Sequence, residues 1–171
     1  MKVIVIYKSG TGFTKKYAQW IAEDLNCESI DVKNLNKINL SQYDLVIYGS
    51  SVMANKLKEI EKIKKIVQQN LIIFGVGLAP VIHATDKIRN ENLTLEEQAN
   101  IPFYYFQGGI DYEKLGFASR KILRMICYSL QKKKKKTEED IGMIEGLSAS
   151  CDYTHKDYIL PLIEKVKTEF L

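Results

Sequence analysis

The chain has 171 residues, of which 46% are hydrophobic, so it is long enough to bury the core of one domain. Its 25 basic and 21 acidic residues give a net charge of +4, and no apolar run approaches the roughly 20 residues that a membrane-spanning helix needs. The three cysteines and two histidines have no spacing typical of a disulfide framework or a metal site. We therefore expect a single cytoplasmic domain over residues 1–171, without a bound metal.

Short apolar runs alternate with amphipathic patterns along the whole chain. Runs without polar alternation are typical of strands buried on both faces of a parallel sheet, and apolar residues three and four positions apart predict helices. In chain order, these patterns predict a strand at 2–7, a helix at 17–25, strands at 28–32 and 44–49, a helix at 57–67, a strand at 71–75, a short helix opened by the capping pair Thr94 and Glu97, a strand at 101–107, and helices at 116–131 and 159–170.

This alternation predicts an α/β fold in which a parallel five-stranded sheet has helices on both faces. Ligands of such sheets bind beyond the carboxyl ends of the strands. The segments 8–14, 50–55 and 75–83 each follow a predicted strand, so we expect them to meet at that edge of the sheet.

A turn rich in glycine and hydroxyl side chains separates the first strand from the first helix. Gly10 and Gly12 allow a tight turn and a close approach of the backbone to a ligand. The free N–H groups and the positive dipole end of the following helix favour an anion. The predicted phosphate-binding residues are Ser9, Gly10, Thr11, Gly12, Phe13 and Thr14.

Other phosphate-binding motifs do not fit this turn. Lys15 stands where a dinucleotide fingerprint needs its third glycine, and Phe13 stands where a Walker loop needs lysine. A response-regulator site needs acidic residues at the end of the first strand, where this chain has Tyr7 and Lys8. A turn that only caps the helix is the remaining alternative.

The turn resembles the loop that holds the FMN phosphate in flavodoxins, whose pattern is Thr/Ser-x-Thr-Gly-x-Thr. All four specified positions match, at Ser9, Thr11, Gly12 and Thr14. In element order the resemblance covers the whole chain. It implies a flavodoxin-like three-layer sandwich with strand order 2-1-3-4-5, and FMN as the cofactor.

In flavodoxins the segments after the third and fourth strands hold the flavin ring. The resemblance therefore implies that the cofactor-binding residues include Ser50, Ser51, Val52, Met53, Ala54, Asn55, Gly75, Val76, Gly77 and Leu78. Asn55 tolerates a positive φ and could support a peptide flip near flavin N5. Neither segment has the Trp or Tyr that sandwich the ring in many flavodoxins, so either one flavin face is open to a flat substrate or flavin binds weakly.

Positive charge is concentrated in residues 112–136, which hold nine basic side chains and one acidic side chain. A basic amphipathic helix such as 117–136 can lie on an anionic membrane surface, here the inner face of the membrane. In the alternative, its apolar side packs on the domain and its lysines are solvated. The run lacks the interleaved aromatics of a nucleic-acid site, so we expect no nucleic-acid partner.

A second resemblance concerns the same region. Gly108–Tyr112, a basic apolar helix and then Asp152–Thr154 are similar to the menaquinone-dependent protoporphyrinogen oxidases, which are flavodoxin-like enzymes with an insertion near this point. The tract Lys132–Lys136 departs from their pattern. The resemblance implies an insertion at about 110–150 and an FMN-dependent oxidoreductase that takes hydrogen from a flat reduced substrate and passes electrons to a quinone.

No side chain is an obvious catalytic acid or base, so we expect the chemistry to belong to the flavin. Two alternatives remain: a non-catalytic electron carrier that docks on a redox protein partner, and a module without flavin. Ordinary shuttle flavodoxins are markedly acidic, and a sequence pI of about 8.8 does not favour that role.

Overall fold

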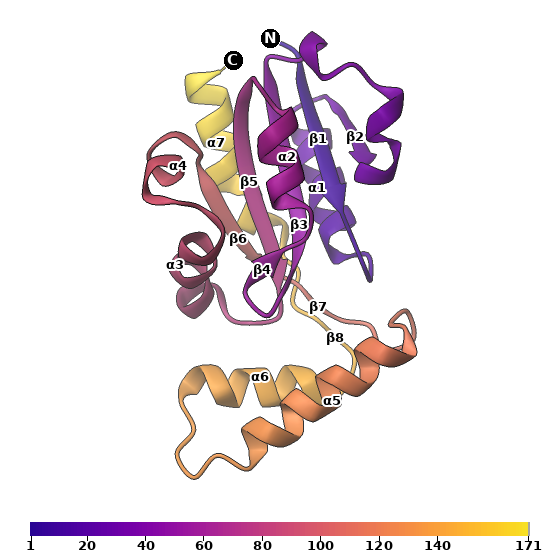
Figure 1. Cartoon of the computed structure of the whole chain (residues 1–171), viewed down its shortest axis with the longest axis vertical. Coiled ribbons are helices and arrows are strands. Elements are labelled where there is room, and N and C mark those ends of the chain that lie inside the picture. Colours follow the sequence, from indigo (N-terminus) through magenta and orange to yellow (C-terminus); the bar gives the residue numbers. More distant parts are fainter. Residues whose placement is uncertain (171) are drawn as a thin grey trace.

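A computed structural model describes residues 1–170 as a three-layer α/β sandwich with a pair of helices projecting from one end (Figure 1). Five parallel strands form the central sheet in the order β2-β1-β3-β5-β6. This is the predicted order, because β5 and β6 are the fourth and fifth predicted strands. The strands are β1 (Val3–Lys8), β2 (Glu28–Asp31), β3 (Leu45–Met53), β5 (Asn70–Gly77) and β6 (Phe103–Gln107), with β4 (Lys56–Leu57) paired antiparallel to the end of β3.

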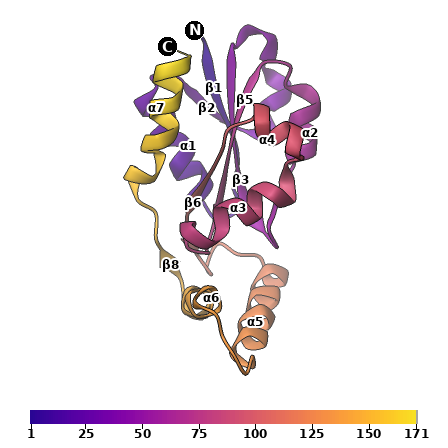
Figure 2. The same cartoon turned by 90° about the vertical axis from the view of Figure 1, so that its left-hand side faces the viewer.

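The two faces of the sheet are covered by different helices (Figure 2). Successive residues such as Ile4 and Val5 point to opposite faces and are both fully buried, which explains why the strands read as continuous apolar runs. The α-helices of the sandwich are α1 (Phe13–Asp24) and α7 (Leu160–Glu169) on one face, and α2 (Ile60–Ile66) and α3 (Val81–Asn92), followed by α4 (Leu95–Asn100), on the other. Short 3-10 helices occupy Val32–Lys37, Leu40–Gln42 and Lys156–Ile159.

The insertion lies beyond the carboxyl ends of the sheet strands (Figure 1). Its neck is the antiparallel pair β7 (Gly109–Ile110) and β8 (Cys151–Asp152), and its body is the hairpin of α5 (Phe117–Gln131) and α6 (Glu138–Ser148). Cys127 and Leu147 are buried between the two helices. Thr137 and Asp140 form a capping box at the start of α6, and Lys133 pairs with Asp140 at 2.7 Å. The turn of the hairpin is therefore fixed by polar contacts.

The structure corrects three local expectations. Residues 50–53, predicted as a loop, continue β3, and residues 75–77 belong to β5. Ala54 and Asn55, with φ of 49° and 62°, form a two-residue left-handed turn into β4, a geometry that suits the twist of an antiparallel hairpin. Leu57, predicted in a helix, lies in β4 instead, and α2 begins at Ile60.

No helix within residues 1–170 combines the length and the apolar character needed to cross a bilayer.

Candidate functional site

The turn between β1 and α1 presents backbone N–H groups at an uncapped helix start. Gly12 has a φ of 107°, a left-handed conformation that a side chain would strain. Gly12 N–H donates a hydrogen bond to Ser9 Oγ at 3.1 Å, which closes the turn. Among residues 1–170 no side chain caps α1, and its first turn has no acidic residue. The first N–H groups of a helix have no partner within it, so here they are available to an anion.

A cavity of about 490 Å³ joins this turn to the other two predicted segments. Its volume lies within the range of about 300–1,000 Å³ that is typical of small-molecule sites. The predicted residues that line it are Ser9, Gly10, Thr11, Phe13, Thr14, Ser51, Val52, Met53, Ala54, Asn55, Val76, Gly77 and Leu78. Three segments distant in the sequence thus meet at the carboxyl edge of the sheet.

Three predicted residues do not line this cavity. Ser50 is fully buried; its Oγ accepts a hydrogen bond from Lys58 N–H at 2.9 Å and donates one to Lys58 C=O at 3.1 Å, so its hydroxyl supports the β3–β4 hairpin. Gly75 faces the side chains of Val52 and Leu57. Gly12 lines a neighbouring cavity of about 450 Å³ beside the neck of the insertion.

Ser51 brings an unpaired hydroxyl to the cavity wall. Its Oγ is buried and has no hydrogen-bond partner within residues 1–170. A buried polar group without a partner costs about 1–3 kcal/mol, and a hydroxyl-bearing cofactor could satisfy it. This orphaned hydroxyl and the uncapped start of α1 together fit a phosphorylated cofactor with a hydroxylated chain, such as FMN.

The helical insertion supplies a further wall of the cavity that the sequence pattern did not predict. Its contribution is apolar: Ile122, Leu123 and Ile126 come from α5, and Met143 and Leu147 come from α6. A helix at 116–131 is predicted, but the pattern does not predict its position over the flavin-facing segments. One feature of the sequence indicates this position: the apolar side of the helix is broader than packing against a single partner helix requires.

Aromatic side chains reach the cavity from outside the two flavin-facing segments. Phe13 comes from the start of α1 and Tyr105 comes from β6. Tyr105 donates its hydroxyl to Ala79 C=O at 2.9 Å, and burial raises its pKa, so it stays a neutral donor. Trp20 packs edge-on against Tyr17, with ring centroids 5.4 Å apart, and so lies against the core and not at the cavity.

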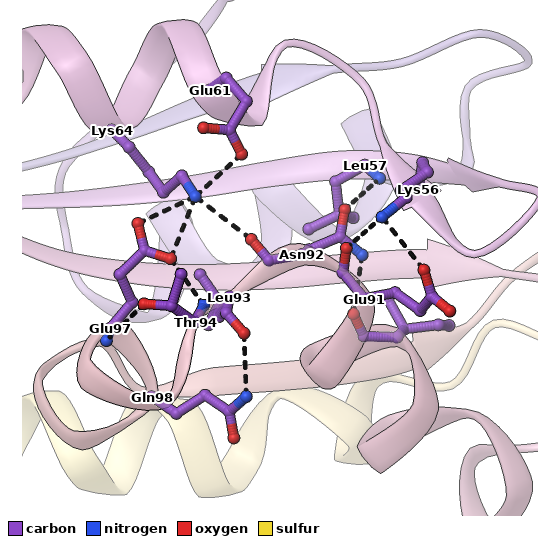
Figure 3. A network of polar contacts seen from close by, with 11 residues as sticks. Lys56, Leu57, Glu61, Lys64, Glu91, Asn92, Leu93, Thr94, Glu97 and Gln98 are labelled. Atoms are coloured by element: carbon purple, nitrogen blue, oxygen red, sulfur yellow. Dashed lines mark hydrogen bonds and ion pairs between the residues drawn. The ribbon is translucent and has the colours of Figure 1, made fainter.

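The polar network around Asn92 (Figure 3) holds the neighbouring turn at Ala54 and Asn55 in place. Asn92, the buried last residue of α3, accepts a hydrogen bond from Leu57 N–H at 2.9 Å. Its amide donates to Asn55 C=O and to Ile88 C=O, both at 2.7 Å. One side chain therefore ties the cavity-lining hairpin to α3.

A second arm of the network joins α2 to α4 (Figure 3). The Lys64 ammonium contacts carboxylate oxygens of Glu61 and Glu97, each at 2.9 Å, and lies 3.3 Å from Asn92 C=O. The hydrogen bond from Thr94 N–H, and then the Lys64 ammonium, lower the pKa of Glu97. This arm stabilises the same region without touching the cavity-lining turn.

We expect Asn92→Leu to lower the free energy of unfolding by about 1–3 kcal/mol, because it leaves Asn55 C=O and Leu57 N–H without their buried partner. FMN binding should weaken as well, since Ala54 and Asn55 line the cavity. Urea unfolding and an FMN titration measure the two effects. Lys64→Met is the control, because it removes the second arm only; if it weakens FMN binding as much as Asn92→Leu, the tie to Asn55 is not the cause.

The order of the parallel sheet and a phosphate-type turn at its first crossover define a nucleotide-binding protein of flavodoxin-like fold. The sequence model of the family described as flavodoxin domain matches residues 4–138, and the chain belongs to that family. The family assignment confirms the flavodoxin-like family that was predicted from the turn between β1 and α1. FMN is the cofactor that goes with this family.

Several solved flavoproteins are similar in structure. A flavodoxin from the domain Archaea is 20% identical over 98% of this chain and 99% of its own, with a TM-score of 0.41. A flavoprotein from Lactobacillus acidophilus, solved in complex with FMN, is 15% identical over 62% of this chain and 91% of its own, with a TM-score of 0.42. A flavoprotein from Bacteroides eggerthii is 14% identical over 61% of this chain and 85% of its own, with a TM-score of 0.44. A search of curated proteins gave no match.

Proposed function

We propose that this protein is an FMN-dependent oxidoreductase that dehydrogenates a flat, apolar, reduced substrate and passes the electrons to a quinone, as the menaquinone-dependent protoporphyrinogen oxidases do. The observation that carries the proposal is the wall that α5 and α6 add to the cavity. Apolar residues such as Leu123 and Met143 lie there opposite the flavin-facing segments. A wall of this kind suits a planar hydrophobic substrate, whereas an electron carrier needs a flavin edge that another protein can reach.

The side chains around the cavity have separate tasks in this proposal. The N–H groups at the start of α1 and the hydroxyls of Thr11 and Thr14 bind the phosphate. Ser51 bonds the hydroxylated chain, and the Ala54–Asn55 turn, held by Asn92, faces the ring. Helices α5 and α6 exclude water from the substrate.

When bound, FMN would supply the redox chemistry: in each step two electrons and two protons leave the substrate and convert one quinone to a quinol, so oxidation of protoporphyrinogen to protoporphyrin would take three steps and three quinones. The charged side chains at the wall have a structural task. Lys87 of α3 and Glu139 of α6 form an ion pair at 3.4 Å, which ties the insertion to the sandwich. None of them is needed as a catalytic acid or base.

The proposal is tested by mixing the FMN-loaded protein with protoporphyrinogen and a water-soluble menaquinone analogue. We expect the fluorescence of protoporphyrin to rise faster than in controls that lack the protein or the quinone. Bound FMN without catalysed oxidation would falsify the proposal and leave the electron carrier as the function of this flavoprotein.

A matched pair of variants tests the role of the insertion. Ile122 and Ile141 are 48% and 47% exposed and lie on the two helices of the hairpin, but Ile122 lines the cavity and Ile141 does not. Ile122→Glu should lower turnover at least tenfold, because a carboxylate against an apolar substrate costs more than the roughly 1.4 kcal/mol that a factor of ten represents. Ile141→Glu should keep its turnover, and equal losses in both variants would place the substrate elsewhere.

A further inference from the structure

Helix α5 has an exposed apolar stripe on the side that does not contact α6. Phe117 is 85% exposed, Met125 is 62% exposed and Tyr128 is 59% exposed. At about 100° per residue these side chains fall within one quarter of the helix circumference, whereas Cys127, which points away from them, is buried against α6. An exposed apolar patch with a polar rim marks an interaction surface.

Basic side chains border this stripe, and α5 contains no acidic residue. Lys121 falls within the same quarter of the helix circumference, Arg124 lies just outside it, and Lys132 and Lys134–Lys136 follow at the end of the helix, all of them exposed. The Lys132 ammonium lies 4.4 Å from the ring centroid of Tyr128, so positive charge and apolar surface adjoin. Lys133 differs from its neighbours because it pairs with Asp140.

We propose that α5 docks on an anionic lipid surface, with Phe117, Met125 and Tyr128 in the boundary between headgroups and acyl chains and the lysines at the lipid phosphates. Charge complementarity favours an anionic lipid surface over a second copy of the chain, and the apolar stripe favours it over a nucleic acid. A second copy of the chain would bring the same positive charges together, and a nucleic acid would leave the apolar stripe in water.

The docking surface is continuous with the cofactor cavity. Ile122 and Ile126 line the cavity and are also 48% and 39% exposed on α5. Docking brings the cavity next to the acyl chains, from which an apolar substrate or a quinone would enter. This consequence rests on the proposed function, whereas the docking itself does not.

Co-sedimentation with vesicles tests the proposal. We expect the protein to bind vesicles of phosphatidylcholine mixed with phosphatidylglycerol, to bind pure phosphatidylcholine at least tenfold less, and to dissociate as the salt concentration rises. Protein with and without FMN should bind alike, because the stripe does not include the phosphate turn. A failure of the proposed oxidoreductase function therefore leaves this result unchanged.

Three variants locate the surface. Replacing Lys132 and Lys134–Lys136 with glutamine, which spares Lys133, should lower binding about fivefold per charge. The double variant Phe117→Ser and Met125→Ser should lower binding at least tenfold. The control variant replaces four other lysines with glutamine. These lysines lie outside the insertion, are exposed and form no ion pair within residues 1–170, so this variant should bind like the unmodified protein. These control lysines are Lys33, Lys37, Lys65 and Lys167.

Equal binding to both kinds of vesicle, binding to neither, or an equal loss in the control variant overturns the proposal. Sedimentation in solution adds a further check. A stable dimer that dissociates in the Phe117→Ser and Met125→Ser variant also overturns it, because the stripe would then be an interface between two copies.

Discussion

Thr14→Val should lower the affinity for FMN by about ten- to a hundredfold and leave the affinity for riboflavin unchanged. Thr14 lies in the first turn of α1, is only 2% exposed and lines the cavity. Valine has nearly the same shape, so the variant removes the hydroxyl alone. A hydrogen bond to a charged group contributes about 1.5–3 kcal/mol, and about 1.4 kcal/mol corresponds to a factor of ten. Quenching of flavin fluorescence during a titration measures both affinities.

Thr85→Val is the matched control for this experiment. Thr85 Oγ1 donates a hydrogen bond to Val81 C=O at 2.9 Å within α3 and does not line the cavity. The control should bind FMN like the unmodified protein. A Thr14→Val variant that loses riboflavin as strongly as FMN would show that the hydroxyl shapes the turn and does not contact the phosphate.

Gly109→Ala should break the neck of the insertion. A Cβ at this position would lie 2.0 Å from Cys151 C=O oxygen and 2.9 Å from its carbonyl carbon, which are backbone atoms of β8. Because a backbone cannot rotate away as a side chain can, β7 and β8 must separate. Overpacking of this kind costs about 1–3 kcal/mol, and each kcal/mol lowers the melting temperature of a chain of this size by about 2–4 °C.

Two measurements follow the loss of the neck: the melting temperature and the rate of proteolysis within α5 and α6. Both should change in Gly109→Ala, and turnover should fall with them, because the apolar wall is no longer held over the cavity. Gly116→Ala is the control, since a Cβ there meets nothing within 4 Å. If the two variants are equally destabilised, the close contact with Cys151 does not hold the neck.

The phosphate turn was predictable because its geometry is set by neighbours in the sequence. Ser9 closes the turn on Gly12, and Thr14 lies in the first turn of the helix, within a few residues of both. The strand order followed from the resemblance that this short motif carries. A local motif with a fixed position in the fold thus identified the family and the three segments at the strand ends that line one side of the cavity.

Ser50 was predicted to bind the cofactor from its position after a predicted strand, but the residue that it contacts is not a neighbour in the sequence. Serine at the end of a buried strand looks the same in the sequence whether its hydroxyl faces a ligand or a backbone. Here β3 continues into a hairpin, and Lys58, eight residues further on, takes both hydrogen bonds of that hydroxyl. Only the pairing of β3 with β4 decides between the two outcomes.

Helix α6 was not predicted, although its start is recognisable in the sequence. Thr137 and Asp140 have capping-box spacing, and Ile141 and Ile144 follow three residues apart. The periodicity of apolar residues does not show which part of the broad apolar side of α5 is buried in the hairpin and which part stays exposed. In the structure Leu123 packs in the hairpin while Met125 remains exposed, a division that depends on where α6 lies.

The claim on which the functional assignment depends is that the turn between β1 and α1 holds the phosphate of FMN. Parallel titrations of the unmodified protein with FMN and with riboflavin, followed by visible absorption, test it most directly. Several hydrogen bonds to one phosphate predict an affinity for FMN at least a hundredfold above that for riboflavin. Equal affinities for the two flavins, or a protein that binds neither, would contradict the claim.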